Sequence, residues 1–98
     1  MKEIKWFSGG TERAEVALSE ISIILGLIPA ETKTNELRQL LFDYAQEINE
    51  GVTAVPYILS RMSIAVSNCM TKNKITISPE ASAHLKKLFA LGEIRYGY

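Results

Sequence analysis

The chain has 98 residues, of which 47% are hydrophobic and 22% charged, and these values are typical of a single small globular domain spanning residues 1–98. Eleven basic and eleven acidic side chains leave no net charge, which argues against a general nucleic-acid binder because that mode relies on many uncompensated cations. The charge is unevenly placed: residues 1–49 hold five basic and eight acidic side chains, whereas residues 50–98 hold six basic and three acidic. Any attraction for an anionic partner or membrane surface therefore belongs to the C-terminal half.

The sequence gives no sign of export. Cys69 is the single cysteine, so no disulfide can form within the chain and nothing indicates an oxidising compartment. No apolar run follows the basic residues near the N-terminus, as a signal peptide would require. The longest uncharged apolar stretch, 21–30, is interrupted by Gly26 and Pro29 and is too short to span a bilayer. We expect a cytoplasmic protein.

Two helices are predicted in the first half. The first spans residues 11–27 and is stopped by Pro29. The second spans residues 34–50, where the Thr34 hydroxyl is expected to cap the free N–H groups and Gly51 to end the helix in the left-handed conformation. Apolar residues recur at helical spacing in both segments, which predicts one buried stripe on each helix.

The second half predicts two more helices. The third spans residues 54–72, and its apolar stripe consists of Val55, Leu59, Met62, Val66, Cys69 and Met70. Residues 74–77 alternate like a strand, but one short strand without a partner is marginal, so we expect an extended connector. Ser78 as a cap and Pro79 in the first turn start a fourth helix over residues 79–91.

Short connections between four such helices predict an all-α fold, an antiparallel up-and-down four-helix bundle with an aromatic C-terminal tail. The residues expected to be buried share the helical periodicity of their segments. They are Leu18, Ile21, Leu25, Leu41, Tyr44, Leu59, Met62, Val66, Leu85 and Leu88.

No pattern points to catalysis, a cofactor or a metal. His84 is the only histidine, so a His/Cys zinc cluster cannot form, and its place beside the apolar stripe favours a boundary residue. Cys69 lies on a buried stripe and is interpreted as a small core residue. Glu47 and the other helix-surface glutamates are interpreted as solvated carboxylates. We expect a protein that is not an enzyme.

The outer face of the third helix is the best candidate for binding. Tyr57, Arg61, Ile64 and Asn68 follow one another at helical spacing, on a line opposite the core stripe. Tyrosine and arginine with an exposed aliphatic residue match the composition of protein-binding hot spots. The alternative is structural: single exposed apolar residues are common, and Arg61 can pair with an acid of a neighbouring helix.

Apolar residues also lie off the main stripe of the first helix, at Val16, Ile23 and Leu27. They can receive Trp6 and Phe7 folding back, pair two monomers, or stay exposed, and fold-back is our preferred interpretation because two large aromatics need burial. Residues 95–98 (RYGY) leave a similar choice between a tail packed in a groove of the bundle and a presented recognition element.

Three blocks in this order, residues 5–10 (KWFSGG), 55–62 (VPYILSRM) and 95–98 (RYGY), give the chain a family likeness. It resembles immunity proteins of class IIa (pediocin-like) bacteriocins. The resemblance implies a protein that protects the producer cell from its own bacteriocin. It further implies binding to the bacteriocin-bound mannose phosphotransferase permease from the cytoplasmic side, blocking of the opened pore, and discrimination among bacteriocins by the half from residue 55 onward.

The resulting hypothesis is a cytoplasmic monomer that associates transiently with the membrane and binds no nucleic acid. The alternative is a cytoplasmic helical adaptor or regulator of another membrane complex, which would use the same surfaces. The expected partner-binding residues combine the ridge on the third helix, lysines of the C-terminal half and the tail. They are Tyr57, Arg61, Ile64, Asn68, Lys72, Lys74, Lys86, Lys87, Arg95, Tyr96 and Tyr98.

Overall fold

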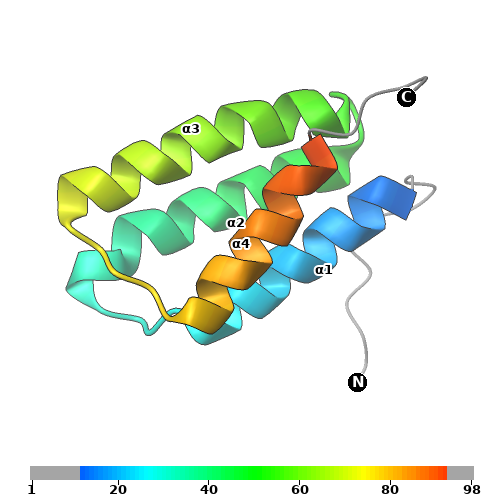
Figure 1. Cartoon of the computed structure of the whole chain (residues 1–98). Helices are drawn as coiled ribbons and strands as arrows, with labels where there is room; N and C mark the ends of the chain where they lie inside the picture. The colour runs from blue at the N-terminus through cyan, green and yellow to red at the C-terminus, as the bar shows by residue number, and fades with distance from the viewer. Residues whose placement is uncertain (1–11, 93–98) are drawn as a thin grey trace.

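Four α-helices make up most of residues 12–92, the part of the chain that the computed structural model describes. They are α1 (Glu12–Leu27), α2 (Asn35–Glu50), α3 (Val55–Asn73) and α4 (Pro79–Gly92), with a short 3-10 helix, η1 (Thr32–Thr34), before α2. Consecutive helices pack against each other in antiparallel pairs, and α4 closes the arrangement by packing against α1 (Figure 1). The predicted all-α antiparallel bundle is confirmed for these residues; the aromatic tail lies outside them.

The core consists of the inward stripes of all four helices. Eight of the ten residues predicted to be buried are buried, while Leu25 and Tyr44 are partly buried and pack against the core. The structure adds Ile58, which is 0% exposed on the flank of α3 that faces α2, and Ile75 of the connector. Both were absent from the predicted core because a simple stripe does not show how far neighbouring elements wrap around a helix.

Local capping chemistry explains several helix ends. Ser78 Oγ accepts a hydrogen bond from the N–H of Ala81 at 3.1 Å, as expected of an N-cap. Gly51 ends α2 with φ +72°, and its N–H donates to the carbonyl of Ile48. Left-handed backbone of this kind favours glycine because a side chain would clash there.

The expected capping role of Thr34 is wrong. Its hydroxyl donates to the carbonyl of Pro29 at 2.6 Å and accepts from the N–H of Glu31 at 3.1 Å. The side chain is buried, so these bonds satisfy a hydroxyl that has lost water and fix the turn between α1 and α2. A 3-10 turn therefore precedes α2 where a hydroxyl cap was expected.

The backbone at the end of α3 sets the direction of the connector to α4. Lys74 adopts the left-handed conformation with φ 55°, and the N–H of Ile75 donates to the carbonyl of Met70 at 2.9 Å. This bond resembles the closing bond of a Schellman motif, in which the residues at the two ends also make an apolar contact. Ile75 is thereby turned into the core, and residues 75–78 continue as an extended connector, as predicted.

Candidate functional site

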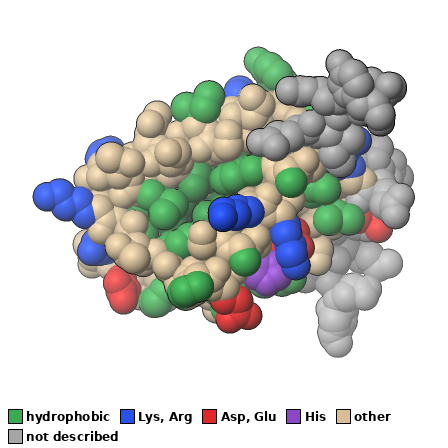
Figure 2. Space-filling model, in the orientation of Figure 1, with side chains coloured by type: hydrophobic (Ala, Val, Ile, Leu, Met, Phe, Trp, Pro, Cys, Tyr) green, Lys and Arg blue, Asp and Glu red, His purple; other side chains and the backbone are tan. Residues whose placement is uncertain are grey.

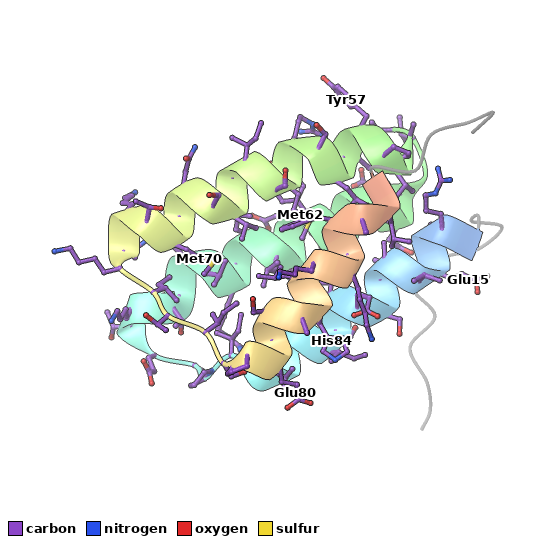
Figure 3. All side chains as sticks on the ribbon, in the orientation of Figure 1. Glu15, Tyr57, Met62, Met70, Glu80 and His84 are labelled. Atoms are coloured by element: carbon purple, nitrogen blue, oxygen red, sulfur yellow. The ribbon has the colours of Figure 1, made fainter. Side chains whose placement is uncertain are left out.

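The outer face of α3 exposes large side chains, as the helical spacing predicts. Tyr57 and Ile64 are each 62% exposed, and Asn68 is exposed on the same face. In Figure 3 Tyr57 points away from the bundle, whereas Met62 on the same helix points into it. Between Tyr57 and Thr71 the solvent-facing positions of α3 are otherwise serine, asparagine and threonine. Apart from Arg61, this face carries no charged side chain over about 20 Å of helix.

Arg61 does not project outward from this face, and the outward orientation expected from sequence is wrong for this residue. Its guanidinium pairs with the carboxylate of Glu47 on α2. It also lies over two rings, 5.1 Å from the centroid of Tyr57 and 5.7 Å from that of Tyr44. The structural alternative, pairing with an acid of a neighbouring helix, is the arrangement found. Arg61 thus links α3 to α2 and contacts the exposed ring of Tyr57.

Glu47 was interpreted as a solvated carboxylate, and this interpretation is wrong as well. Its side chain is 30% exposed and that of Arg61 is 40% exposed, so the pair is partly withdrawn from water. The Arg61 Nε atom is buried without a hydrogen-bond partner among the described residues.

A double-mutant cycle on this pair gives the first testable prediction. Arg61→Ala and Glu47→Ala should each lower the free energy of unfolding, with a coupling energy of about 0.5–1 kcal/mol, since the pair is partly solvated. Arg61→Ala should cost more than Glu47→Ala because it also removes both ring contacts. Urea unfolding measures these values, with Arg61→Lys as the control that keeps the charge and loses the planar stacking. Additive single effects would show that the pair is not energetically coupled.

Lys72 lies at the far end of α3 in a surface cluster with α2. Its Nζ is 3.4 Å from Glu36 Oε2, and the side-chain amide of Asn73 donates to Glu36 Oε1 at 3.2 Å. The hydrogen bond from Asn73 and, next, the charge of Lys72 lower the pKa of the Glu36 carboxyl. The same amide of Asn73 lies 3.6 Å from Cys69 Sγ. Burial raises the pKa of the Cys69 thiol, which keeps it protonated and agrees with a core role.

The Glu36 cluster predicts a pH dependence of stability. The folded state lowers the pKa of this carboxyl, so the unfolded chain binds its proton more readily, and stability rises with pH across this range. The contribution is present above the unfolded pKa and is lost as the pH falls through the folded pKa. Glu36→Gln should therefore be less stable than the parent at neutral pH, and the difference should shrink in acid.

Urea unfolding at neutral and acidic pH measures this difference. Glu50→Gln is the matched control at the other end of α2, where no described residue is bonded to the carboxylate. A Glu36→Gln deficit that persists unchanged in acid would contradict the assignment.

The other predicted lysines are exposed. Lys74 sits at the C-cap of α3, and Lys86 and Lys87 lie on the outer surface of α4. Lys86 lies on the flank of α4 that faces α3, and Lys87 lies on the flank that faces α1. Among the described residues, the structure therefore does not gather the predicted site residues into one cluster. The ridge is on α3, Lys72 is bound to α2, and Lys86 and Lys87 are on separate flanks of α4.

Several predicted residues lie outside the described part of the chain. These are Arg95, Tyr96 and Tyr98 of the tail and Trp6 and Phe7 near the N-terminus. The expected receiving surface is described: Val16 and Ile23 are 41% and 40% exposed on α1, and Leu27 is partly buried. Whether these three bind the N-terminal aromatics or a second chain stays a prediction.

Two cross-helix contacts were not found by sequence reasoning. His84 Nδ1 lies 2.6 Å from Glu20 Oε1, which joins α4 to α1 across a contact in which both side chains are largely covered. Arg38 on α2 donates from Nη1 to the carbonyls of Leu25 at 2.8 Å and Ile28 at 2.5 Å. Leu25 lies in the last turn of α1 and Ile28 directly follows the helix, so Arg38 caps the end of α1 from outside.

Residues 12–92 contain no group of three or more His, Cys, Asp or Glu side chains that could hold a metal ion. Within the same residues, no helix is both long and apolar enough to cross a membrane.

Comparisons with known proteins agree with this picture. A model of the bacteriocin immunity protein family matches residues 12–93. The crystal structure of an immunity protein that contributes to the self-protection of bacteriocin-producing Enterococcus mundtii 15-1A superimposes with a TM-score of 0.79 at 29% identity. It covers 84% of this chain and 99% of its own. The solution structure of PisI matches with a TM-score of 0.78 at 36% identity over 100% of both chains.

A relative from Carnobacterium maltaromaticum, an uncharacterized 9.1 kDa protein in the BM1 immunity protein 3′ region, is 32% identical over 81 residues. The match covers 83% of this chain and all of that protein.

The chain belongs to the bacteriocin immunity protein family. The resemblance to class IIa immunity proteins seen in the sequence is thereby confirmed. The family is non-enzymatic, which confirms the expectation that this chain is not an enzyme.

Proposed function

We propose that this protein protects its cell by binding the bacteriocin-bound mannose phosphotransferase permease from the cytoplasmic side and blocking the opened pore. The observation that supports a binding mechanism best is the uncharged outer face of α3, with Tyr57 and Ile64 each 62% exposed. Exposed aromatic and aliphatic side chains on a rigid helix, surrounded by small polar residues, suit burial against a partner protein. Family membership supplies the reason for self-protection.

Within this proposal the partner-binding residues divide by role. Tyr57 and Ile64, with Asn68, bury surface at the centre, and Arg61 holds the Tyr57 ring in place. The lysines at the margin act mainly on encounter and orientation because solvated rim charges change association rates more than affinity. The proposed set is Tyr57, Arg61, Ile64, Asn68, Lys72, Lys74, Lys86, Lys87, Arg95, Tyr96 and Tyr98. The protein acts as a cytoplasmic monomer that meets the membrane only through its partner.

Expression in a bacteriocin-sensitive strain tests the function. The strain should become resistant to one pediocin-like peptide and stay sensitive to others. An affinity-tagged chain should recover the permease from detergent extracts only after exposure to that peptide. A well-expressed chain that protects against no member of a panel would favour the alternative, a regulator of another membrane complex. Recovery of the permease without any bacteriocin would contradict binding to the bacteriocin-bound state.

Removal of residues 95–98 tests the tail. If Arg95, Tyr96 and Tyr98 contact the partner, the shortened chain should lose protection while helicity and thermal melting stay unchanged. If the tyrosines instead belong to the core, melting temperature should fall together with protection. Circular dichroism and protection are measured on the same variant. A shortened chain that is folded and fully protective would remove the tail from both roles.

A further inference from the structure

The packing of α3 against α4 is uneven along their length. At the C-terminal end of α4 the two helices are in close contact, since a Cβ atom placed on Gly92 would lie 3.0 Å from Leu59 Cβ and 3.5 Å from the carbonyl oxygen of Pro56. Toward the connector of residues 74–78 the helices spread apart (Figure 1). The space-filling view shows a hollow between them, lined by apolar side chains (Figure 2).

Contacts with the other helices identify the walls of this hollow. On α4, His84 turns toward α1, so the flank that carries Phe89 faces α3. On α3, Arg61 turns toward α2, so the flank that carries Met70 faces α4. Met70, Phe89 and Ile77 of the connector pack against the core and remain only partly buried. The facing flanks of α3 and α4 thus leave Met70 and Phe89 partly accessible along one groove.

The charge at the border of the groove has one sign. Lys86 is exposed on the rim of α4, one turn before Phe89. The α3 wall carries no charge between Tyr57 and Thr71 except Arg61, and Arg61 is turned away and neutralised by Glu47. Glu80 lies in the first turn of α4, on the side away from α3 (Figure 3). An occupant with a carboxylate would meet Lys86 and no opposing acid from these two walls.

We propose that the groove between α3 and α4 receives an acidic amphipathic helix of the partner protein. Apolar side chains of that helix pack over Met70 and Phe89, and a carboxylate on its flank pairs with Lys86. Recognition of this kind uses anchors one and two turns apart, and the accessible α3 wall from Ser63 to Met70 offers about 10 Å, or two turns. The flexible thioether of Met70 can adjust to the inserted side chains.

The inference rests on the proposed function for the identity of the partner protein and on the groove for the partner's chemistry. Two helical peptides of about 15 residues serve as probes. They share leucines along one face and differ only in carrying glutamates or lysines along the flank. Each is titrated into the full-length ¹⁵N-labelled chain. The glutamate peptide should bind at least about tenfold more tightly than the lysine peptide, and the amides near Ser63, Met70 and Phe89 should shift.

Two neighbouring lysines provide matched variants. Lys86→Glu should reverse the preference between the peptides, whereas Lys87→Glu, the same change on the α1 flank, should leave it intact. Equal affinities for the two peptides, equal effects of the two variants, shifts confined to the Tyr57–Ile64 face, or no binding at millimolar peptide would each overturn the proposal.

Two alternative occupants of the groove, the chain's own end and a second copy of the chain, are tested in the same full-length protein. If Tyr96→Ala and Tyr98→Ala in the full chain shift the groove amides without peptide, the chain's own end fills the groove and the proposal falls. If the chain dimerises in a way that Lys86→Glu abolishes, a second copy is the occupant and the proposal falls too. A chain that protects cells but binds no peptide rejects the groove alone, and a chain that binds peptide but protects no strain rejects the proposed function alone.

Discussion

Replacing Leu59 with alanine should lower the free energy of unfolding by about 2–5 kcal/mol, the usual cost of removing a large aliphatic side chain from a packed core. Leu59 is 1% exposed, and a Cβ atom placed on Gly92 of α4 would lie 3.0 Å from its Cβ, so α3 and α4 are in close contact there. The surrounding helices cannot easily close around the space left behind, because Gly92 already brings the two backbones together. A domain of this size has only about 5–15 kcal/mol of stability in total, so the change is a large part of it.

Ile64→Ala is the matched control for this loss. It removes a similar volume from the same helix, but Ile64 is 62% exposed and should cost no more than about 0.5 kcal/mol. Chemical denaturation of both variants gives the comparison, and an unchanged slope with denaturant shows that the unfolded states are alike. Similar losses at the two positions would mean that the core and outer faces of α3 are wrongly assigned.

The features that could be predicted from the sequence are those set by local chemistry. The hydroxyl of Ser78 and the fixed φ of Pro79 start α4, and Gly51 ends α2, through contacts within a few residues of each position. Helical spacing of apolar residues likewise depends only on the geometry of one helix. For this reason Leu59, Met62, Val66 and Cys69 are buried where they were expected.

The features that could not be predicted depend on which helices become neighbours. Ile58 is buried because α2 covers that flank of α3. Arg61 turns toward α2 because its guanidinium pairs with Glu47 and lies over the ring of Tyr44 on that helix. The pairing of Glu20 with His84 joins residues 64 positions apart. A helical wheel gives the angle of each residue around its own axis but not the partner that lies at that angle. The candidate ridge was therefore right for Tyr57, Ile64 and Asn68 as exposed residues and wrong for Arg61.

This reassignment of Arg61 sharpens the interpretation of the α3 face. A free arginine would have favoured an acidic partner at this position, but the guanidinium is already paired with Glu47 and lies over the rings of Tyr44 and Tyr57. What remains available is apolar and uncharged, namely the ring of Tyr57 and the side chain of Ile64. Contact with the partner through this face should therefore depend little on salt, while any contact through Lys86 should depend on it.

The largest functional effect is expected at Ile64. Ile64→Gln replaces an apolar anchor with a polar side chain of similar length and good helix propensity, so the fold should be kept. If the outer face of α3 is buried against the partner, loss of a central anchor should lower the bacteriocin concentration that cells tolerate at least about tenfold. The readout is growth of a sensitive strain that expresses the variant, with equal protein levels and unchanged thermal melting.

Ile23→Gln on α1 makes the same change in a residue that is 40% exposed on another face of the bundle. It should keep full protection, because the proposed contacts all belong to the half of the chain from residue 55 onward. Loss of protection in Ile23→Gln with normal Ile64→Gln would place recognition on α1 and contradict the proposed site. Equal losses in two folded variants would mean that the partner surrounds the bundle and that no single face decides recognition. The proposed site therefore requires that protection be lost in Ile64→Gln and kept in Ile23→Gln. That result agrees with recognition through the outer face of α3, which Arg61 and Glu47 connect to α2.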